Sequence, residues 1–123
     1  MNEQTELKIG IGTLDRERVA LKPAKVKIVG VKIEETAKAK KVSFIVKHPD
    51  KEEPIKLSSV SYIMEKEVVT SGTWFNLDKE GKLQRDSATA ILLRKIGALT
   101  IEDAVGKDCE TELEGKYLCF KAY

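Results

Sequence analysis

A regular alternation that breaks at one point dominates the first half of this sequence. Val26 and Ile28 alternate with lysines, which is the period of a β-strand with one buried face. The alternation slips at Val29–Gly30 and then resumes up to Glu35. A glycine at such a slip predicts a β-bulge and a sharp bend in the strand. A long bent strand restricts the fold, because one such strand can join both sheets of a small barrel.

Four later segments also carry a strand pattern. The second and third predicted strands are joined by a polar turn with two prolines, so the first three strands should form an antiparallel meander. The last segment reads as a hairpin that turns at Glu114–Gly115. In chain order these segments are Lys41–His48, Ile55–Ile63, Val68–Leu77 and Asp108–Tyr123. The alternation shifts phase at Ser58–Ser59 in the third strand, and Ser71–Gly72 breaks the fourth.

One helix is predicted between the fourth strand and the closing hairpin. Asp86 or Ser87 can cap its start, and Gly97 can end it. The apolar residues at helical spacing are Ala88, Ile91, Leu92, Ile96 and Leu99. The fold class is therefore mainly β with one packed helix.

The length of the chain fits one domain. A chain of 123 residues can bury a core without disulfides or metals. Residues 1–20 lack a clear period and are predicted to be an N-terminal arm, and residues 21–123 the domain. No apolar run approaches the ~18 residues of a membrane span, and the polar N-terminus resembles no signal peptide. We expect a cytoplasmic protein, and its Lys and Glu content with only two Asn and two Gln is typical of heat-adapted proteins.

The charges are unevenly distributed along the chain. The net charge is +2, but residues 21–60 carry ten lysines against five acids, whereas residues 61–123 carry nine basic and eleven acidic groups. A polyanion could use the first region and would be repelled by the second. The alternative is a solvated surface of lysine and glutamate without a partner.

The order of predicted elements resembles the oligonucleotide/oligosaccharide-binding (OB) fold, and most of all the small single-stranded-DNA-binding proteins of phages and archaea. The matching stretches are Gly72–Leu77, Ser87–Gly97 and Val105–Gly106–Lys107, within a layout that covers about residues 24–123. The resemblance implies an antiparallel OB-like barrel of five to six strands, an archaeal or viral source, and single-stranded DNA or RNA as the partner.

No residue pattern points to catalysis. The sequence contains no nucleophile, phosphate-loop or dinucleotide motif. His48 stands beside a proline in a turn, without cysteines or carboxylates at metal-ligand spacing, so we expect a satisfied surface histidine. We therefore expect no enzyme activity, no cofactor and no metal.

Binding of single strands requires cations for the phosphates and exposed aromatic rings for the bases. If the apolar residues of the first three strands point inward, five lysines form one outward basic face: Lys25, Lys27, Lys41, Lys47 and Lys56. The aromatic candidates are Tyr62, Trp74 and Phe75, with Tyr117 as a further one. Trp74 and Phe75 are neighbours in a predicted strand, so one should face inward and the other outward. A single tryptophan in a small barrel more often belongs to the core than to a ligand-binding surface.

The two cysteines can form a disulfide in only one register of the closing hairpin. With a three-residue loop, Leu113–Glu114–Gly115, Cys109 lies directly opposite Cys119. A two-residue loop places Cys109 opposite Phe120 instead. In a reducing compartment we expect two free, partly buried thiols.

Two functions compete at this point. The first is a non-catalytic, sequence-tolerant single-stranded nucleic-acid-binding protein. The second is a protein-interaction module, such as a phage, viral or archaeal accessory protein or an inhibitor, that uses a strand edge or the acidic C-terminal hairpin. The sequence does not indicate an oligomeric state.

Overall fold

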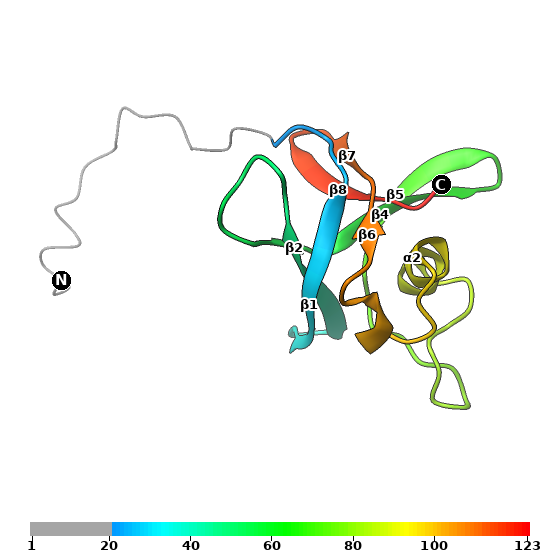
Figure 1. Ribbon diagram of the computed structural model, residues 1–123. Helices are drawn as coiled ribbons and strands as arrows, with labels where there is room; N and C mark the ends of the chain where they lie inside the picture. The colour runs from blue at the N-terminus through cyan, green and yellow to red at the C-terminus, as the bar shows by residue number, and fades with distance from the viewer. Residues whose placement is uncertain (1–20) are drawn as a thin grey trace, which may run out of the picture.

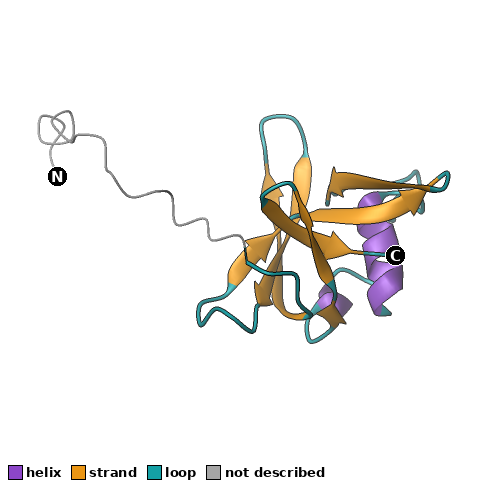
Figure 2. Ribbon diagram, turned by 90° about the horizontal axis from the view of Figure 1, so that it is seen from above, coloured by secondary structure: helices purple, strands orange, loops and turns teal. Residues whose placement is uncertain are grey.

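The computed structural model describes residues 21–123, and the predicted arm of residues 1–20 lies outside the described residues. The fold is mainly β, with two four-stranded sheets, one of them curled into a half-barrel. One α-helix packs at the side of the strands (Figure 1, Figure 2). Among the described residues, no helix is long and apolar enough to cross a membrane.

The first sheet has the strand order β3-β2-β1-β6, and all its pairs are antiparallel. Its strands are β1 (Val26–Glu35), β2 (Lys40–Lys47), β3 (Ile55–Leu57) and β6 (Asp108–Cys109). The pairing of β1 with β2 shifts register between Ile28 and Gly30. The predicted bulge is therefore confirmed at the position of the phase slip.

The second sheet has the order β5-β4-β8-β7. Its strands are β4 (Ser59–Met64), β5 (Glu67–Gly72), β7 (Thr111–Glu114) and β8 (Tyr117–Lys121). Strands β4 and β8 run parallel, with Val60 beside Phe120, and the other pairs are antiparallel. Only Ser58 separates β3 from β4, and only Glu110 separates β6 from β7. Two continuous stretches of chain therefore contribute a strand to each sheet.

The helix α2 (Ala88–Ile96) begins and ends as predicted. The Ser87 hydroxyl accepts a hydrogen bond from the Ala90 N–H at 3.2 Å, and Gly97 has the left-handed φ of 77°. A short 3-10 helix, η1 (Glu102–Ala104), follows. Leu99, which was expected on the buried helix face, lies beyond the end of the helix and is 94% exposed.

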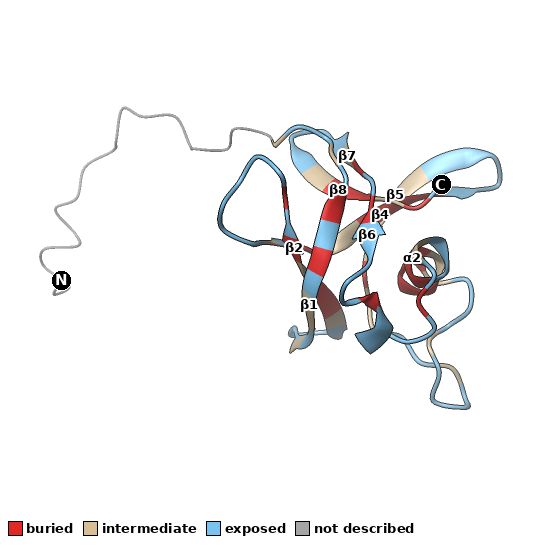
Figure 3. Ribbon diagram, in the orientation of Figure 1, coloured by how far each residue is buried: buried red, intermediate tan, exposed pale blue. Residues whose placement is uncertain are grey.

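The core lies between the two sheets and beneath α2. Its central contact joins Phe44 of β2 and Phe120 of β8, whose rings meet edge to face with centroids 5.3 Å apart. Figure 3 shows buried and exposed residues alternating along the first part of β1. Beyond the bulge the predicted alternation is not kept, because no residue of β1 is buried there and Ile33 is 47% exposed. The completely buried aliphatic residues are Val26, Ile28, Val42, Val46, Val60, Leu92 and Ala104.

Two predicted strands are interrupted at the points where the sequence pattern changes, Ser58–Ser59 and Ser71–Gly72. The expected third strand divides at Ser58 into β3 and β4, which belong to different sheets. The expected fourth strand ends as β5 at Gly72. Beyond it, residues 73–77 carry only isolated bridges, Lys41 with Trp74 and Leu77 with Leu83.

The closing hairpin has neither of the registers considered from sequence. It turns at Gly115–Lys116, so Glu114 pairs with Tyr117 and Glu112 lies opposite Cys119. Cys109 belongs to β6 and pairs with Val26. The register that would join the cysteines is therefore wrong, and both are free, buried thiols.

Candidate nucleic-acid interface

The outward side of the first sheet carries the five lysines that the sequence assigned to it. Val42, Phe44 and Val46 are fully buried, so the alternate residues of β2 face outward. Lys27 lies directly opposite Lys47, and Lys56 opposite the outward Ile45. We call Lys25, Lys27, Lys41, Lys47 and Lys56 the lysine face. From one end of β2 to the other it extends about 20 Å, at roughly 3.4 Å per residue.

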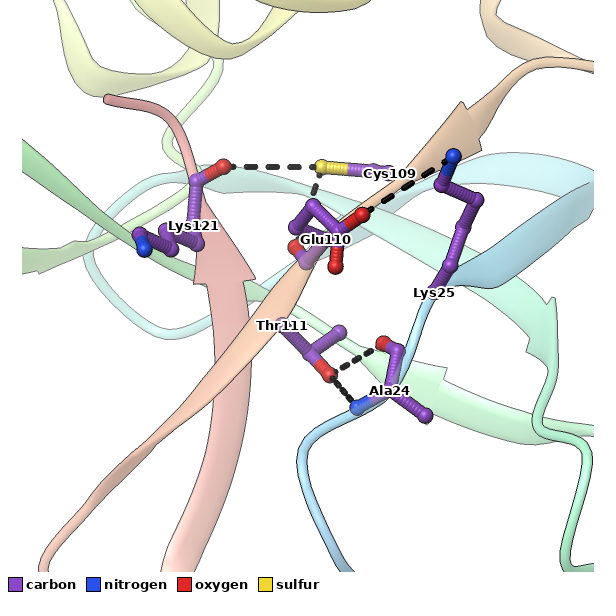
Figure 4. A network of polar contacts seen from close by, with 6 residues as sticks. All are labelled: Ala24, Lys25, Cys109, Glu110, Thr111 and Lys121. Atoms are coloured by element: carbon purple, nitrogen blue, oxygen red, sulfur yellow. Dashed lines mark hydrogen bonds and ion pairs between the residues drawn. The ribbon is translucent and has the colours of Figure 1, made fainter.

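Acidic residues from the end of the chain lie beside this face. Because β6 pairs with β1, Asp108 lies 3.5 Å from the Lys27 ammonium, and Glu110 lies 3.8 Å from that of Lys25 (Figure 4). Along the sequence, the excess of lysines lies in residues 21–60 and the excess of acidic residues in residues 61–123. In the fold, Asp108 and Glu110 from the second region lie beside lysines of the first. The separation of charge along the sequence is therefore incomplete in space.

Glu34 lies on the lysine face directly opposite Lys41. Its carboxylate lies 3.1 Å from the Lys56 ammonium and 3.4 Å from that of Lys32. Hydrogen bonds from Lys56 and then Ser43 lower the pKa of Glu34 to about 2, against a weaker opposing effect of burial. Glu34 is therefore ionised near neutral pH and holds two of the cations.

These ion pairs leave the lysines available to a polyanion. The side chains of Lys25, Lys27 and Lys56 in their ion pairs are half exposed. Exposed pairs of this kind contribute about 0–1 kcal/mol each, and salt screens them. A phosphate group that approaches can replace a carboxylate at little cost.

A groove of about 550 Å³ opens at one end of the lysine face. Four lysines line it together with Asp50, Glu52 and Asp108: Lys25, Lys27, Lys47 and Lys51. The Lys47 ammonium donates a hydrogen bond to the Glu52 carbonyl. This groove is the densest cluster of lysines in the described pockets of the molecule.

His48 lines the same groove but is completely buried. Its Nδ1 accepts a hydrogen bond from the Asp50 N–H at 3.0 Å, so its Nε2 is left to donate to the Lys22 carbonyl at 2.8 Å. The expected surface histidine is therefore satisfied but internal. It fastens the segment before β1 to the loop that forms the wall of the groove.

Trp74 lies at the other end of the lysine face, outside the core cluster. The Lys41 ammonium lies 5.0 Å from the centroid of its ring, a cation–π distance. The neighbouring Phe75 packs against the core cluster and Trp74 does not, although both residues are half-buried.

Gly72 makes room for the Trp74–Lys41 pair, a role that sequence reasoning missed. A Cβ at this position would lie 3.0 Å from Trp74 Nε1 and 3.3 Å from Lys41 Nζ. The only sequence signal was a glycine two residues before the single tryptophan.

Tyr62 does not contribute to the interface. It points inward from β4 and is 8% exposed, because it falls on the buried side of that strand's alternation. Its ring is therefore not accessible to a base. Tyr117, which is exposed, lies on β8 of the second sheet and not on the lysine face.

The described residues offer no metal centre or reactive thiol. Residues 21–123 contain no group of three or more His, Cys, Asp or Glu side chains that could hold a metal ion. Burial raises the pKa of Cys109 to about 11, and Figure 4 shows its thiol directed toward the Lys121 carbonyl. Burial also raises the pKa of Cys119.

Comparisons of the chain with protein-family models, curated proteins and solved structures find no match. A functional assignment therefore has to come from the geometry of the chain itself.

Proposed function

We propose that this protein binds single-stranded nucleic acid along the lysine face, without covalent chemistry. The observation that carries the proposal is the position of Trp74. Its ring is outside the core and beside Lys41, at the end of a strand face that leads to a groove with four lysines. Binding of a single strand needs two components: cations along the phosphate backbone, and an aromatic ring on which a base can stack.

We also propose that the domain is an OB-like barrel of five strands. The order of strand pairs supports it: β1 pairs with β2, β2 with β3, β4 with β8, β7 with β8, and β6 with β1. If β3–β4 and β6–β7 each count as one strand that bends at a single residue, this series of pairs returns to its start. One pair of this series, β4 with β8, is parallel, which departs from the wholly antiparallel barrel expected from the sequence.

In this proposal the nucleic acid lies along β2, from the groove to Trp74. Phosphates replace Asp108 and Glu110 at Lys27 and Lys25, and a base stacks on Trp74 in place of, or beside, the Lys41 ammonium. Neither contact reads the edges of bases, so binding is tolerant of sequence.

The test is a titration with a labelled dT oligonucleotide of about 20 nucleotides at low and moderate salt, followed also by Trp74 fluorescence. The expected result is quenching of Trp74 and a salt dependence of about −0.7 in log–log slope per phosphate contact. Lys27→Ala with Lys47→Ala should lower that slope by about 1.4, since it removes two contacts.

The matched control is Lys66→Ala with Lys116→Ala, which removes two exposed lysines from turns of the second sheet. This control should leave the slope unchanged. Absence of binding at low salt, or an equal effect of both double variants, would contradict the proposal.

A further inference from the structure

A second groove shares no lining residue with the groove at the lysine face. It has a volume of about 720 Å³ and lies between α2, the loop before it and the segment after it. The walls are mainly aliphatic side chains, with Phe75 at one side. The apolar wall residues are Leu77, Leu83, Leu93, Leu99 and Ile101.

Two of these leucines have side chains that remain largely exposed to solvent. Leu99 is 94% exposed and Leu77 is 45% exposed. The Gly97 cap ends α2, and Ala98 turns inward to the core, which leaves Leu99 outside it. Apolar side chains that line a groove and remain exposed favour a partner that covers them.

The rim of this groove is basic. Three cationic side chains line it, Lys82, Arg85 and Arg94, against the single carboxylate of Glu102. Arg94 donates a hydrogen bond to the Arg85 carbonyl at 2.8 Å, which joins the loop to the helix. Within the described part of the chain none of the three forms an ion pair, whereas Lys25, Lys27 and Lys56 of the lysine face do.

We propose that this groove binds a short acidic peptide segment of a partner protein, anchored by apolar side chains. The aliphatic walls take the anchors, and the unneutralised rim takes the carboxylates. The basic rim would attract either an acidic peptide or a nucleic acid, and the aliphatic walls favour the peptide. A strand of nucleic acid would need stacking surfaces, and Phe75, which packs against the core, is the only aromatic residue in the wall.

The experiment uses the full chain and a displayed library of random 12-residue peptides. Selection is made against the wild-type protein, with Leu99→Ser as the counter-selection target. The expected result is enrichment of peptides that combine Asp or Glu with Leu, Ile, Phe or Trp. Leu99→Ser should weaken the binding of the best peptides about tenfold or more, measured by fluorescence anisotropy.

Charge reversal tests the rim separately. Lys82→Glu with Arg85→Glu should weaken the same peptides about tenfold at low salt, and less as salt rises. The matched control is Lys79→Glu, which reverses an exposed charge on the same loop but outside the groove. It should leave peptide affinity within about twofold of wild type. Both changes are at exposed side chains, so the fold should be retained, and circular dichroism checks this.

Three outcomes would overturn the proposal. The first is no enrichment over the Leu99→Ser target, and the second is enrichment of peptides without acidic residues. The third is evidence that something else occupies the groove. This would be a second copy of the chain, seen as a dimer in sedimentation that Leu99→Ser dissociates, or a dT oligonucleotide that displaces the peptides. Loss of oligonucleotide binding in the lysine-face variants alone would leave the peptide result unchanged, so the two proposals fail independently.

Discussion

At the scale of single residues, three of the five lysines of the lysine face are in ion pairs with neighbouring carboxylates. Asp108, Glu110 and Glu34 each lie within ion-pair distance of a lysine that we assign to phosphate contact. Such pairs restrain side chains in solution and compete with any polyanion. Removal of a carboxylate should therefore favour binding.

Asp108→Asn tests this competition directly. The change frees Lys27 while the size of the side chain stays the same, so the affinity for a dT oligonucleotide should rise about twofold to fivefold at low salt, the range expected for an exposed pair. Fluorescence titration measures it. Glu67→Gln, an exposed acid on β5, is the control for net charge, and equal gains from both variants would show that the pair itself is irrelevant.

Glu34 should give the molecule a pH dependence in acid. Its pKa of about 2 lies below the ordinary value of 4.5, so the stability from its contacts is complete above about pH 4.5 and is lost as pH falls toward 2. A carboxyl-detected NMR titration should find a midpoint near 2 for Glu34. Lys56→Met should move the midpoint upward, because Lys56 is the largest cause of the shift. A midpoint near 4.5 in the wild type would contradict the ion-pair geometry.

The two thiols should be unreactive in the folded protein. Cys109 and Cys119 are 4% and 1% exposed, and burial raises the pKa of both, so little thiolate forms at neutral pH. Iodoacetamide at pH 7.5 should modify neither within an hour, and both after addition of denaturant. Mass spectrometry counts the modified sites. Rapid modification of either thiol in the native protein would be inconsistent with its buried position.

At the scale of elements, the hairpin of β4 and β5 contains the least favourable turn of the described chain. Its two turn residues, Glu65 and Lys66, have φ values of 51° and 71°, which are the only positive values among described residues other than glycine. Two-residue turns with both residues in this region prefer Asn-Gly. The left-handed conformation costs other residues about 1–2 kcal/mol each.

Glu65→Asn with Lys66→Gly should therefore raise the free energy of unfolding by about 1–2 kcal/mol, since each replacement relieves a strained φ. Urea denaturation followed by Trp74 fluorescence measures the change. Gly115→Ala is the opposite control: Gly115 has a φ of 61°, so this change should destabilise by about 1 kcal/mol. A loss of stability in the Asn-Gly variant would exclude the proposed turn geometry.

Local pattern was sufficient to predict most of the elements. The bulge at Gly30 and the helix between Ser87 and Gly97 depend on residues close to one another, and both were predicted from sequence. The turn of the closing hairpin was placed one residue too early, because Glu114–Gly115 and Gly115–Lys116 both contain the glycine that a tight turn needs. Pattern cannot distinguish them, since the choice depends on what each side chain meets in the sheet.

The part of the candidate site that depends on local sequence pattern was predicted, and the part that depends on contacts between distant segments was not. The alternation of strand residues predicted that the lysines face outward, and that only one of Trp74 and Phe75 packs against the core. It could not place Asp108 beside Lys27, because that contact depends on which strand becomes the neighbour of β1. The groove beside α2 was also beyond sequence reasoning, since its walls come from three segments that only the fold brings together.

At the scale of the whole molecule, the first and second sheets depend on one another. Phe44 belongs to the first sheet and Phe120 to the second, and both side chains are completely buried. Thr111 of β7 adds a polar link. Its hydroxyl accepts from the Ala24 N–H at 2.9 Å and donates to the Ala24 carbonyl at 2.6 Å, before β1 begins (Figure 4). Neither sheet retains a closed core without the other.

Truncation of Phe120 should therefore affect both sheets equally. Phe120→Ala removes the ring at the centre of the core and should cost about 3–5 kcal/mol, a large part of the roughly 5–15 kcal/mol that stabilises a domain of this kind. A double-mutant cycle of Phe44→Leu and Phe120→Leu should give a coupling of about 0.5–1.5 kcal/mol, as expected for an edge-to-face aromatic pair. Native-state hydrogen exchange then separates the two possibilities for the sheets. If they form one cooperative unit, the slowest amides of β2 and β8 lose protection by the same amount in Phe120→Ala. If β2 retained its wild-type protection while β8 lost its own, the first sheet would be stable alone, and the edge-to-face contact would join two independent units.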